Sequence, residues 1–539
     1  MTATIQAVAE ATETPAGRRR RPWALTIICL GAGLLYAWKI GAGQVGNTYY
    51  SAAAKSMTDG FTNFLFGSFD PYGVVTVDKP PMSLWPQAIS VLIFGFHGWA
   101  LLLPQVIEGV AAVFLLHRTV RLWSGENVAL LAAAILALTP VTVAINRDNN
   151  PDTLLVLLLV AAAYAVTRSV LAMSARGRTT WLLWCAFFTG CGFLTKMLQA
   201  WIIVPALAIM FLAAAGGPLR RRLLDLLGAG LVLILSSFWW IALHDWWPGT
   251  KPYVGSSTDG TAWDLAFGYN GFGRIFGQGG VGGGSGVVTR PGGATVTTSF
   301  GGDPGPVRMF NDIVGGQISW LLPLSLLVLV VLGVRAFVTR SLGDPARRAG
   351  WLLWGGWLLV TAVVFSFAEG TWHPYYTTAM APAVAAISAA GVALLWRRHR
   401  RTLLPLAIAL SAAWAFVLIS RDASWYGWTR WAVVATAAVA VGGLLVGRWG
   451  LVRPALAAGL VSLLLTPAVW SVAAARSTSS GTTPAAGPAV GPGSGPAVTP
   501  GSGPAVTPGS EAAGGPIERG TGPLRTSPPG AGQPAQPAG

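Results

Sequence analysis

Apolar residues recur along this chain in runs long enough to cross a lipid bilayer as helices. A helix needs about 20 residues to cross roughly 30 Å of hydrocarbon. Runs of this kind occupy residues 23–41, 101–119, 127–145, 153–171, 181–195, 198–215, 223–243, 319–338, 350–367, 376–395, 402–420, 430–447 and 454–474. The pattern therefore predicts an all-α polytopic membrane protein with about 13 transmembrane helices.

Two of the segments between these runs are unusually long. The first, residues 42–100, contains amphipathic stretches at 52–57 and 85–96, which predict helices lying at the membrane interface. The second, residues 244–318, becomes Gly-rich from 277 to 302 and predicts a mobile flap or a disordered insert.

The last part of the chain has a different composition. From residue 476 it is rich in Pro, Gly, Ala and Ser, and residues 487–510 are near-copies of one short repeat, so we expect a disordered external tail. The expected organisation is a basic N-terminus (1–22), a catalytic transmembrane module (23–243), a long Gly-rich loop (244–318), C-terminal helices (319–475) and the tail (476–539).

Composition agrees with the membrane prediction. Only 10% of the 539 residues are charged and 53% are hydrophobic, whereas globular proteins carry about 25% charged residues. The three cysteines, Cys29, Cys185 and Cys191, all lie in apolar runs. Their placement argues against a disulfide framework and against a zinc site.

The net charge of +16 reports topology and does not indicate nucleic-acid binding. If the N-terminus is cytoplasmic, 22 of the 36 Lys and Arg residues fall in the short cytoplasmic segments, as the positive-inside rule requires. The first run is expected to be a retained helix, because Trp38 and Lys39 stand where a signal peptide would be cleaved. The C-terminal tail then lies outside.

Most acidic residues fall on the external side in this topology, and the densest cluster is the turn Asn146–Asp152. Asn149 and Asn150 can cap a helix, but capping does not need Arg147, Asp148 and Asp152 as well. Carboxylates beside an Arg stay ionised and can accept a proton or bind a divalent cation. We interpret this turn as a candidate catalytic site.

Three further features share that side. Asp78-Lys79-Pro80-Pro81 can bind a sugar hydroxyl and a phosphate, or can be an ordinary exposed ion pair. His373, followed by Pro374, Tyr375 and Tyr376, can bind substrate or belong to an aromatic belt. Lys196 can bind a lipid phosphate or snorkel to the interface.

Together these residues resemble a known family. An amphipathic helix with Tyr49-Tyr50 after the first span, then Asp-Lys-Pro-Pro, an Asp before the fourth span, and His-Pro-Tyr-Tyr are similar to the polyprenyl-phosphate-sugar-dependent glycosyltransferases of the GT-C superfamily. That group includes protein O-mannosyltransferases and the aminoarabinose transferase of lipid A (glycosyltransferase family 39). Segments 194–200, 267–271 and 315–320 resemble a bacterial subgroup of mannosyltransferase-like proteins.

The resemblance implies an enzyme of the bacterial plasma membrane. Its donor would be a sugar, a hexose such as mannose, on a polyprenyl phosphate, and its acceptor a lipid, glycan or protein at the outer face, in contact with membrane lipids and without nucleic acid. The expected catalytic residues are Asp78, Asp148 and Asp152, with Lys79, Arg147 and Lys196 at the donor phosphate. Substrate-binding residues would be Tyr49, Tyr50, Trp85, Asn149, Asn150, His373, Tyr375 and Tyr376, and a divalent metal ion would take Asp78, Asp152 and His373.

One departure from the family concerns catalysis. Relatives carry an Asp-Glu pair shortly after the first span, and this chain has Gly46-Asn47 there. The base would then be one of the three carboxylates named above. Two other classes remain open at this point: a secondary transporter or lipid flippase, and a membrane anchor that displays the tail.

Overall fold

The computed structural model describes residues 22–42, 45–277, 300–477 and 483–488, together with the backbone of 287–289 and 295–297. The described residues all belong to one compact unit, and residues 498–539 lie outside the described part. The expected tail, 476–539, is therefore described only at residues 476, 477 and 483–488.

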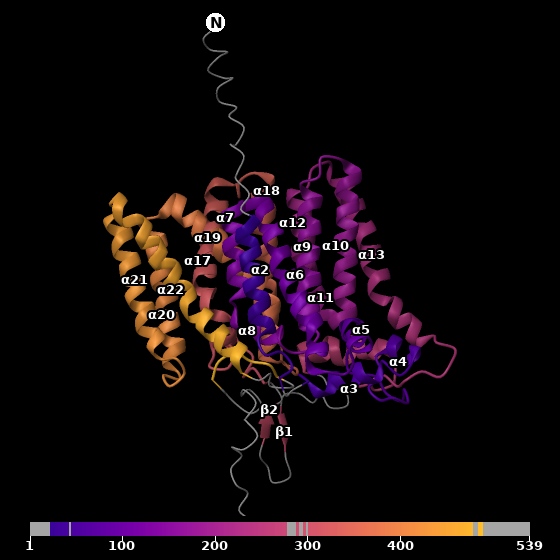
Figure 1. Ribbon diagram of the computed structural model, residues 1–539. Helices are drawn as coiled ribbons and strands as arrows, with labels where there is room; N and C mark the ends of the chain where they lie inside the picture. Colours follow the sequence, from indigo (N-terminus) through magenta and orange to yellow (C-terminus); the bar gives the residue numbers. More distant parts are fainter. Residues whose placement is uncertain are drawn as a thin grey trace, which may run out of the picture. The chain divides into compact units, whose positions relative to one another are not determined.

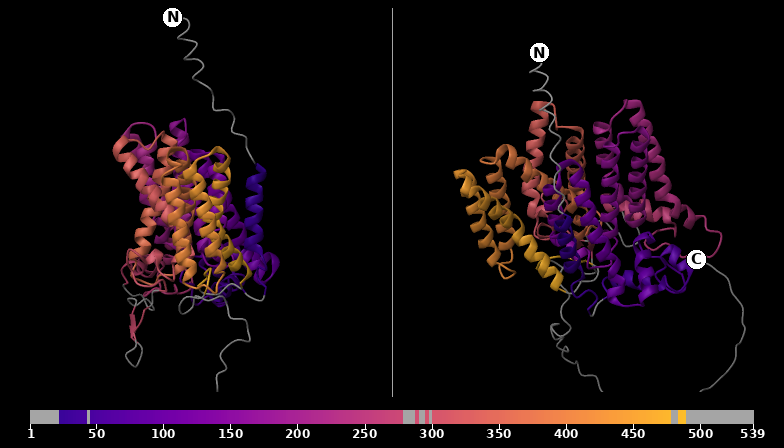
Figure 2. Two further views of the ribbon diagram at one scale, coloured as in Figure 1. Left: turned by 90° about the vertical axis from the view of Figure 1, so that its left-hand side faces the viewer. Right: turned by 45° about the horizontal axis from the view of Figure 1, so that its top comes forward.

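Helices that run roughly side by side make up this unit (Figure 1). They are α2 (Pro22–Ala37), α6 (Gly98–Ser124), α7 (Glu126–Ala137), α8 (Pro140–Ile145), α9 (Asp152–Val170), α10 (Ala175–Lys196), α11 (Leu198–Trp201), α12 (Val204–Ala214), α13 (Leu219–Asp245), α17 (Leu322–Thr339), α18 (Pro345–Phe367), α19 (Ala381–His399), α20 (Leu403–Ser420), α21 (Trp428–Val446) and α22 (Trp449–Arg476). Figure 2 shows α20 to α22 forming one flank of the bundle.

Each of the thirteen expected runs overlaps one or two of these helices, but thirteen membrane crossings are not confirmed. Within the described ranges, nine helices are long and apolar enough to cross a membrane, and four apolar helices are shorter. One of the four is Pro81–Phe94, which the sequence analysis assigned to the interface. The helix α10 is long enough, but its Thr, Gly and Trp residues make it less apolar.

Apolar side chains cover the outside of the bundle as well as its interior. On α13, Leu227 is 71% exposed and Leu231 is 59% exposed, and Val330 on α17 is 62% exposed. A surface of this kind would aggregate in water and is stable against lipid. The structure therefore agrees with a polytopic membrane protein.

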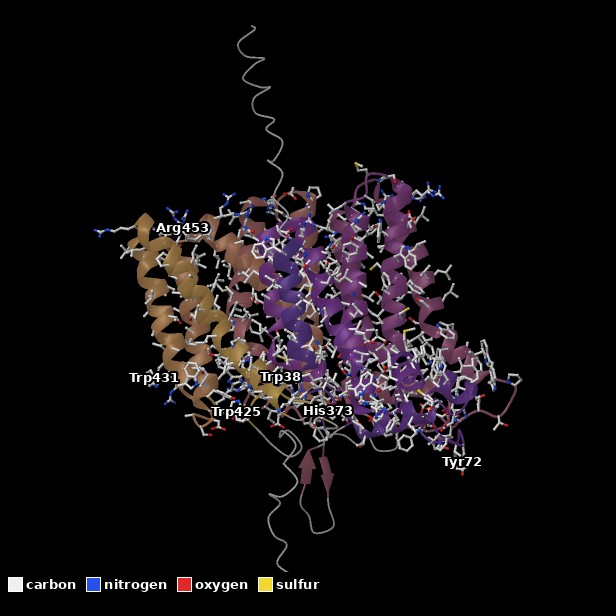
Figure 3. The ribbon with its side chains drawn as sticks, viewed as in Figure 1. Trp38, Tyr72, His373, Trp425, Trp431 and Arg453 are labelled. Carbon is white, nitrogen blue, oxygen red and sulfur yellow. The ribbon has the colours of Figure 1, made fainter. Side chains whose placement is uncertain are left out.

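Short elements between the long helices collect at one end of the bundle (Figure 1). In the first long loop they are α3 (Thr48–Ser56), α4 (Phe61–Phe66), η1 (Pro81–Ser83) and α5 (Leu84–Phe94). In the second they are α14 (Ala262–Asp264), the π-helix η2 (Leu265–Phe272), α15 (Gly273–Phe276), η3 (Arg308–Phe310), α16 (Gly315–Ile318) and η4 (Ser319–Leu321), and η5 (Pro374–Met380) precedes α19. Tyr72 and His373 lie at this end, and Arg453 lies at the opposite one (Figure 3).

Main-chain hydrogen bonds join the two long loops. The Thr76 amide donates to the Tyr253 carbonyl oxygen at 2.8 Å, and the Tyr253 amide donates to the Val74 carbonyl oxygen at 2.8 Å. This pairing brings residues 74–81 next to the start of the second loop. As a result, Asp78 and Lys79 lie next to η2, where Lys79 contacts Asn270.

The all-α prediction is confirmed, and the described residues add one short strand pair. These strands are β1 (Val287–Thr289) and β2 (Thr295–Thr297), which pair antiparallel with Val288 opposite Val296. The rest of the Gly-rich run, apart from Gly277 and residues 300–302, lies outside the described residues. In the expected tail, residues 483–488 have no regular secondary structure and pack on the bundle through Gln317.

Candidate active site

The Asp-Lys-Pro-Pro motif forms a buried ion pair at the polar end of the bundle. Lys79 Nζ donates to Asp78 Oδ2 at 2.7 Å and to Asn270 Oδ1 at 2.8 Å. Asn270 Nδ2 donates in turn to the Asp78 carbonyl oxygen at 2.7 Å. The two Pro residues that follow have no amide hydrogen and hold the chain extended into η1. The motif is thus fixed by the second long loop, and it is not an ordinary exposed ion pair.

A second buried ion pair joins two long helices. Lys196 Nζ, at the end of α10, lies 2.7 Å from both carboxylate oxygens of Asp152, at the start of α9. It also lies 3.6 Å from the centroid of the Tyr376 ring, which is a cation–π contact. The backbone turns sharply after Lys196, because Met197 has a positive φ of 48° and ends α10. Lys196 therefore does not snorkel to the membrane interface. Its ammonium lies in a polar site inside the protein.

Arg274 is a third cation at this site, and the sequence analysis did not identify it. Its guanidinium lies 4.3 Å from the centroid of the Tyr269 ring and donates to the Thr371 carbonyl oxygen at 2.8 Å. The Gly370 amide donates to the Arg274 carbonyl oxygen at 3.2 Å. A Cβ added at Gly370 would lie 2.0 Å from the Gly273 carbonyl oxygen, so the close approach of these loops requires glycine.

These cations line one small open cavity of about 60 Å³. Its polar lining consists of Lys79, Lys196, Arg274, Asn270 and Gln199, and Tyr376 and Trp372 add aromatic surface. Its apolar lining is made by Leu198, Ile202, Ile275, Val364, Phe365 and Ala368. Cationic and apolar groups around one cavity fit a molecule with an anionic head and a hydrocarbon chain.

The charges around the cavity do not balance. Asp78 pairs with Lys79 and Asp152 pairs with Lys196, but no carboxylate in the described ranges lies at salt-bridge distance from Arg274. Burial tends to raise the pKa of Asp78, but the neighbouring Lys79 ammonium holds it below its ordinary value, so the carboxyl is ionised. One positive charge therefore remains for a bound anion.

Tyr49 and Tyr50, on α3, contact Asp78 from the other side. The Tyr50 hydroxyl donates to Asp78 Oδ1 at 3.3 Å, and the Tyr49 hydroxyl accepts from the Asp78 amide at 3.0 Å. Asp78 nevertheless keeps 16% of its side chain exposed, whereas Asp148 and Asp152 are each 0% exposed. Of the three expected bases, Asp78 is the one whose side chain is not fully buried.

The residues of the Asn146–Asp152 turn have different roles, some at the site and others at helix ends. Asp152 reaches the site through Lys196, but Arg147 caps the end of α2, where Nη1 donates to the carbonyl oxygens of Tyr36 at 3.0 Å and Trp38 at 2.6 Å. Asn149 holds the start of α3, because its Oδ1 accepts from the Asn47 amide at 2.6 Å. Asn150 donates to Asp148 at 2.8 Å. The guanidinium of Arg147 is not part of the cavity wall, so we leave it out of the phosphate-binding set.

Two other expected residues support the site without lining the cavity. Trp85 Nε1 donates to the Phe64 carbonyl oxygen at 2.8 Å, which packs α5 against α4. His373 is stacked between Phe300 and Tyr375, with ring centroids 4.6 Å and 5.2 Å away. Burial, together with the positive charges of Arg274 and Lys196, lowers the pKa of His373 well below its ordinary value. The imidazole is therefore neutral and serves as an aromatic surface.

The residues present do not fit the divalent metal ion expected at Asp78, Asp152 and His373. Each carboxylate is already neutralised by a lysine at 2.7 Å. Across the residues that the structure describes, no three His, Cys, Asp or Glu side chains come together as a ligand set. We derive no step through a metal.

Comparison with known proteins places the chain in a family. It is 34% identical over 543 residues to the Bacillus subtilis (strain 168) protein "Putative mannosyltransferase YycA", covering 86% of this chain and 78% of that protein. This chain belongs to the YycA family. A second B. subtilis relative, "Putative mannosyltransferase YkcB", is 32% identical over 70% of this chain and 62% of its own length.

Two further matches are also to transferases. The family described as "Dolichyl-phosphate-mannose-protein mannosyltransferase" matches residues 78–241, which begin at Asp78 and contain Lys79, Asp152 and Lys196. An undecaprenyl phosphate-alpha-4-amino-4-deoxy-L-arabinose arabinosyl transferase of Pseudomonas aeruginosa (strain UCBPP-PA14) is 24% identical over 42% of each chain. This YycA-family protein is therefore a membrane glycosyltransferase of the GT-C superfamily.

Solved structures confirm the fold. ArnT from Cupriavidus metallidurans, bound to undecaprenyl phosphate, superposes with a TM-score of 0.54 at 17% identity and covers 84% of this chain and 77% of that one. The Archaeoglobus fulgidus oligosaccharyltransferase superposes with a TM-score of 0.51 at 14% identity over 87% of this chain and 57% of its own. The YycA-family enzyme thus shares the architecture of both transferases.

Proposed function

We propose that this enzyme transfers a sugar, a hexose such as mannose, from a polyprenyl-phosphate donor to an acceptor at the outer face of the plasma membrane. The observation that carries the proposal is the cavity itself. Lys79, Lys196 and Arg274 provide one more positive charge than Asp78 and Asp152 neutralise, in a cavity that apolar side chains also line. The donor class is supported by the ArnT structure bound to undecaprenyl phosphate and by the Pseudomonas relative's name.

The three cations act on the leaving group. The donor is a phosphodiester with one negative charge, and the departing polyprenyl phosphate is a monoester with up to two. The additional negative charge develops as the bond between the sugar C1 and the phosphate oxygen breaks. Cations already fixed around that oxygen stabilise the transition state more than the bound donor, and such a difference is what accelerates a reaction.

Asp78 acts as the base in this proposal. The acceptor hydroxyl forms the new bond to C1, and its proton passes to the partly exposed Asp78 carboxylate. Lys79 holds the pKa of Asp78 below its ordinary value, so the carboxylate is ionised at neutral pH, and the same shift makes it a weaker base than a free carboxylate. Tyr50 fixes the carboxylate orientation by donating to Oδ1. Asp152 holds Lys196 and acts on the phosphate through it.

The transporter alternative has less support. Transporters bind substrate near the bilayer midplane, between repeated halves. The ionised groups of this site lie at one end of the bundle, close to His373 in Figure 3, and the family is one of transferases.

Release of free polyprenyl phosphate tests the proposal. The purified full chain in lipid nanodiscs is incubated with polyprenyl-phosphate hexoses and acceptors, and the freed lipid phosphate is quantified by mass spectrometry. We expect Asp78→Asn to lower kcat by about 10²- to 10⁴-fold, the usual contribution of a general base. Asp59→Asn, on the same loop but exposed, should keep the wild-type rate. An unchanged rate in Asp78→Asn would contradict the assignment.

A further inference from the structure

A second cavity is lined by residues of α16, α20 and α22. It is open, has a volume of about 480 Å³, and its walls include Gly316, Gln317, Leu418, Arg421, Trp470 and Ala486. None of these residues belongs to the active-site cavity. Part of the wall is contributed by a piece of the chain's own tail, Thr483–Pro488.

The side chain of Gln317 binds the main chain of this segment. Gln317 Nε2 donates to the Ala486 carbonyl oxygen at 2.7 Å, and the Ala486 amide donates to Gln317 Oε1 at 2.9 Å. Both halves of one side-chain amide are therefore paired with both main-chain groups of one residue. Gln317 is 6% exposed and Ala486 is 1% exposed. Such a pairing selects an extended peptide with a free amide and does not depend on which side chain follows.

The surrounding surface selects small residues. Gly487 has a φ of +110°, and a Cβ added there would lie 2.3 Å from the Trp470 ring. Gly316, across the same ring, would meet Trp470 at 2.7 Å if it carried a Cβ. Trp470 is held in turn by an edge contact with Trp320, with ring centroids 4.9 Å apart. The site thus accepts a small residue followed by glycine.

We propose that Gln317 on α16 and Trp470 on α22 form a binding surface for extended Ala/Gly/Pro-rich peptides, which residues 483–488 occupy in cis beside the open cavity. The ligand class is a peptide of the form Thr-Pro-Ala-Ala-Gly-Pro. The site reads it by the paired Gln317 amide and by the Trp470 surface that only glycine can approach. An attached segment competes with a free peptide at an effective concentration of about 1 mM, so the site is open to other peptides only when the tail is displaced.

Hydrogen exchange of the full chain is the first test. The Ala486 amide should exchange about tenfold or more slowly than in the free peptide, because two hydrogen bonds and burial oppose opening. Gln317→Leu should remove this protection, because it deletes the oxygen that accepts the Ala486 amide. Gln317→Asn, whose side chain is one methylene shorter and no longer reaches Ala486, should remove it as well. Unchanged exchange of α9 amides controls for folding. Free-peptide exchange rates in the wild type, or protection retained in both Gln317 variants, would overturn the proposal.

Binding of a labelled peptide is the second test. In Gly487→Ala the tail can no longer seat beside Trp470, so fluorescence anisotropy should show saturable binding of a labelled Thr-Pro-Ala-Ala-Gly-Pro peptide, at least about tenfold tighter than to wild type. The double variant Gly487→Ala/Gln317→Leu should lose that binding. If single and double variants bind the peptide alike, or neither binds it, the site does not exist. Both readouts are independent of glycosyl transfer, so this proposal and the proposed function fail separately.

Discussion

The charge of the site depends on pH, because the Lys79 ammonium loses its proton at a lower pH than a free lysine does. Burial lowers the pKa of its ammonium from 10.5 to about 8 despite the adjacent Asp78. The positive charge is therefore present below about pH 8 and is lost as the pH rises through that value. In the unfolded chain Lys79 stays protonated to higher pH, so this group adds to stability as the pH rises from 8 to 10.5 and does not cause unfolding there.

We expect kcat/KM for donor cleavage to fall tenfold per pH unit above about pH 8, because the neutral amine no longer holds the donor phosphate. Lys79→Arg keeps its charge at all these pH values, so its activity should fall less steeply above about pH 8, where the wild type loses Lys79 in addition to Lys196. The measurement is a pH profile from 6 to 10 with the thermal midpoint followed in parallel. A profile that is flat up to pH 10 in the wild type would remove Lys79 from the phosphate site.

Sequence reasoning identified some residues of the site and missed others for a physical reason. Asp152 and Lys196 stand out because charges beside apolar runs are costly and are functional candidates, and Asp78 and Lys79 stand out because two Pro residues follow them in the first long loop. Arg274 meets these residues only through the fold. The one signal available was that it is a lone cation among aromatic residues, just before the Gly-rich run.

Arg147 is the converse case: sequence reasoning placed it at the donor phosphate, and the structure places it away from the cavity. Its position beside Asp148 suggested a phosphate ligand, but the end of α2 leaves carbonyl oxygens without partners and the guanidinium satisfies them. A linear sequence does not reveal which distant helix end a side chain will cap. The nearest charged neighbour in sequence was therefore a poor guide to its partner.

At the scale of elements, the position of α3 depends on one glycine. Gly46 has a φ of +72°, and a Cβ there would lie 2.6 Å from Asn149 Oδ1, which accepts the Asn47 amide. Asn47 also caps α3, because its side chain accepts from the Tyr49 amide at 3.0 Å. The Gly-Asn pair, where relatives carry acids, thus anchors the helix that brings Tyr49 and Tyr50 to Asp78.

Gly46→Ala should lower the free energy of unfolding by about 1–3 kcal/mol, because it imposes a strained φ and displaces Asn149. It should also lower kcat, since Tyr50 would no longer orient Asp78. Gly60→Ala is the matched control: a Cβ there meets nothing within 4 Å and its φ is 175°. Thermal unfolding and donor cleavage are measured on both variants. Equal behaviour of the two would show that the Gly46 contact does not position α3.

The elements were predicted better than the breaks between them. Apolar runs set helix locations because burial in lipid requires every main-chain group to be paired within the helix. The break between runs 181–195 and 198–215 was predicted and lies at Met197, but the interruptions of run 127–145 into α7 and α8 and of run 198–215 into α11 and α12 depend on tertiary packing. The expected interfacial helices are present as α3 and α5, which begin four and one residues earlier than predicted. The expected division into five segments stays a prediction.

For the whole molecule, charge placement predicts that the end carrying the active site faces outward. Tyr72, 92% exposed, and Arg453 lie at opposite ends of the bundle (Figure 3). In intact cells an impermeant maleimide should therefore label Tyr72→Cys and should label Arg453→Cys only after lysis. The native cysteines lie in apolar helices and are replaced by alanine in the background. The reverse labelling pattern would place the site in the cytoplasm.

Lys79, Lys196 and Arg274, which line the cavity together with apolar side chains, are the central feature of the proposed site. Binding of undecaprenyl phosphate to the purified full chain in nanodiscs tests them, with native mass spectrometry as the readout. Lys79→Met and Arg274→Met should each weaken binding by about tenfold or more, the loss of one charge-assisted hydrogen bond. Lys55→Met, exposed on α3, should bind as the wild type does. If the wild type shows no saturable binding, or all three variants match it, the cavity is not a lipid-phosphate site and the proposed mechanism is wrong.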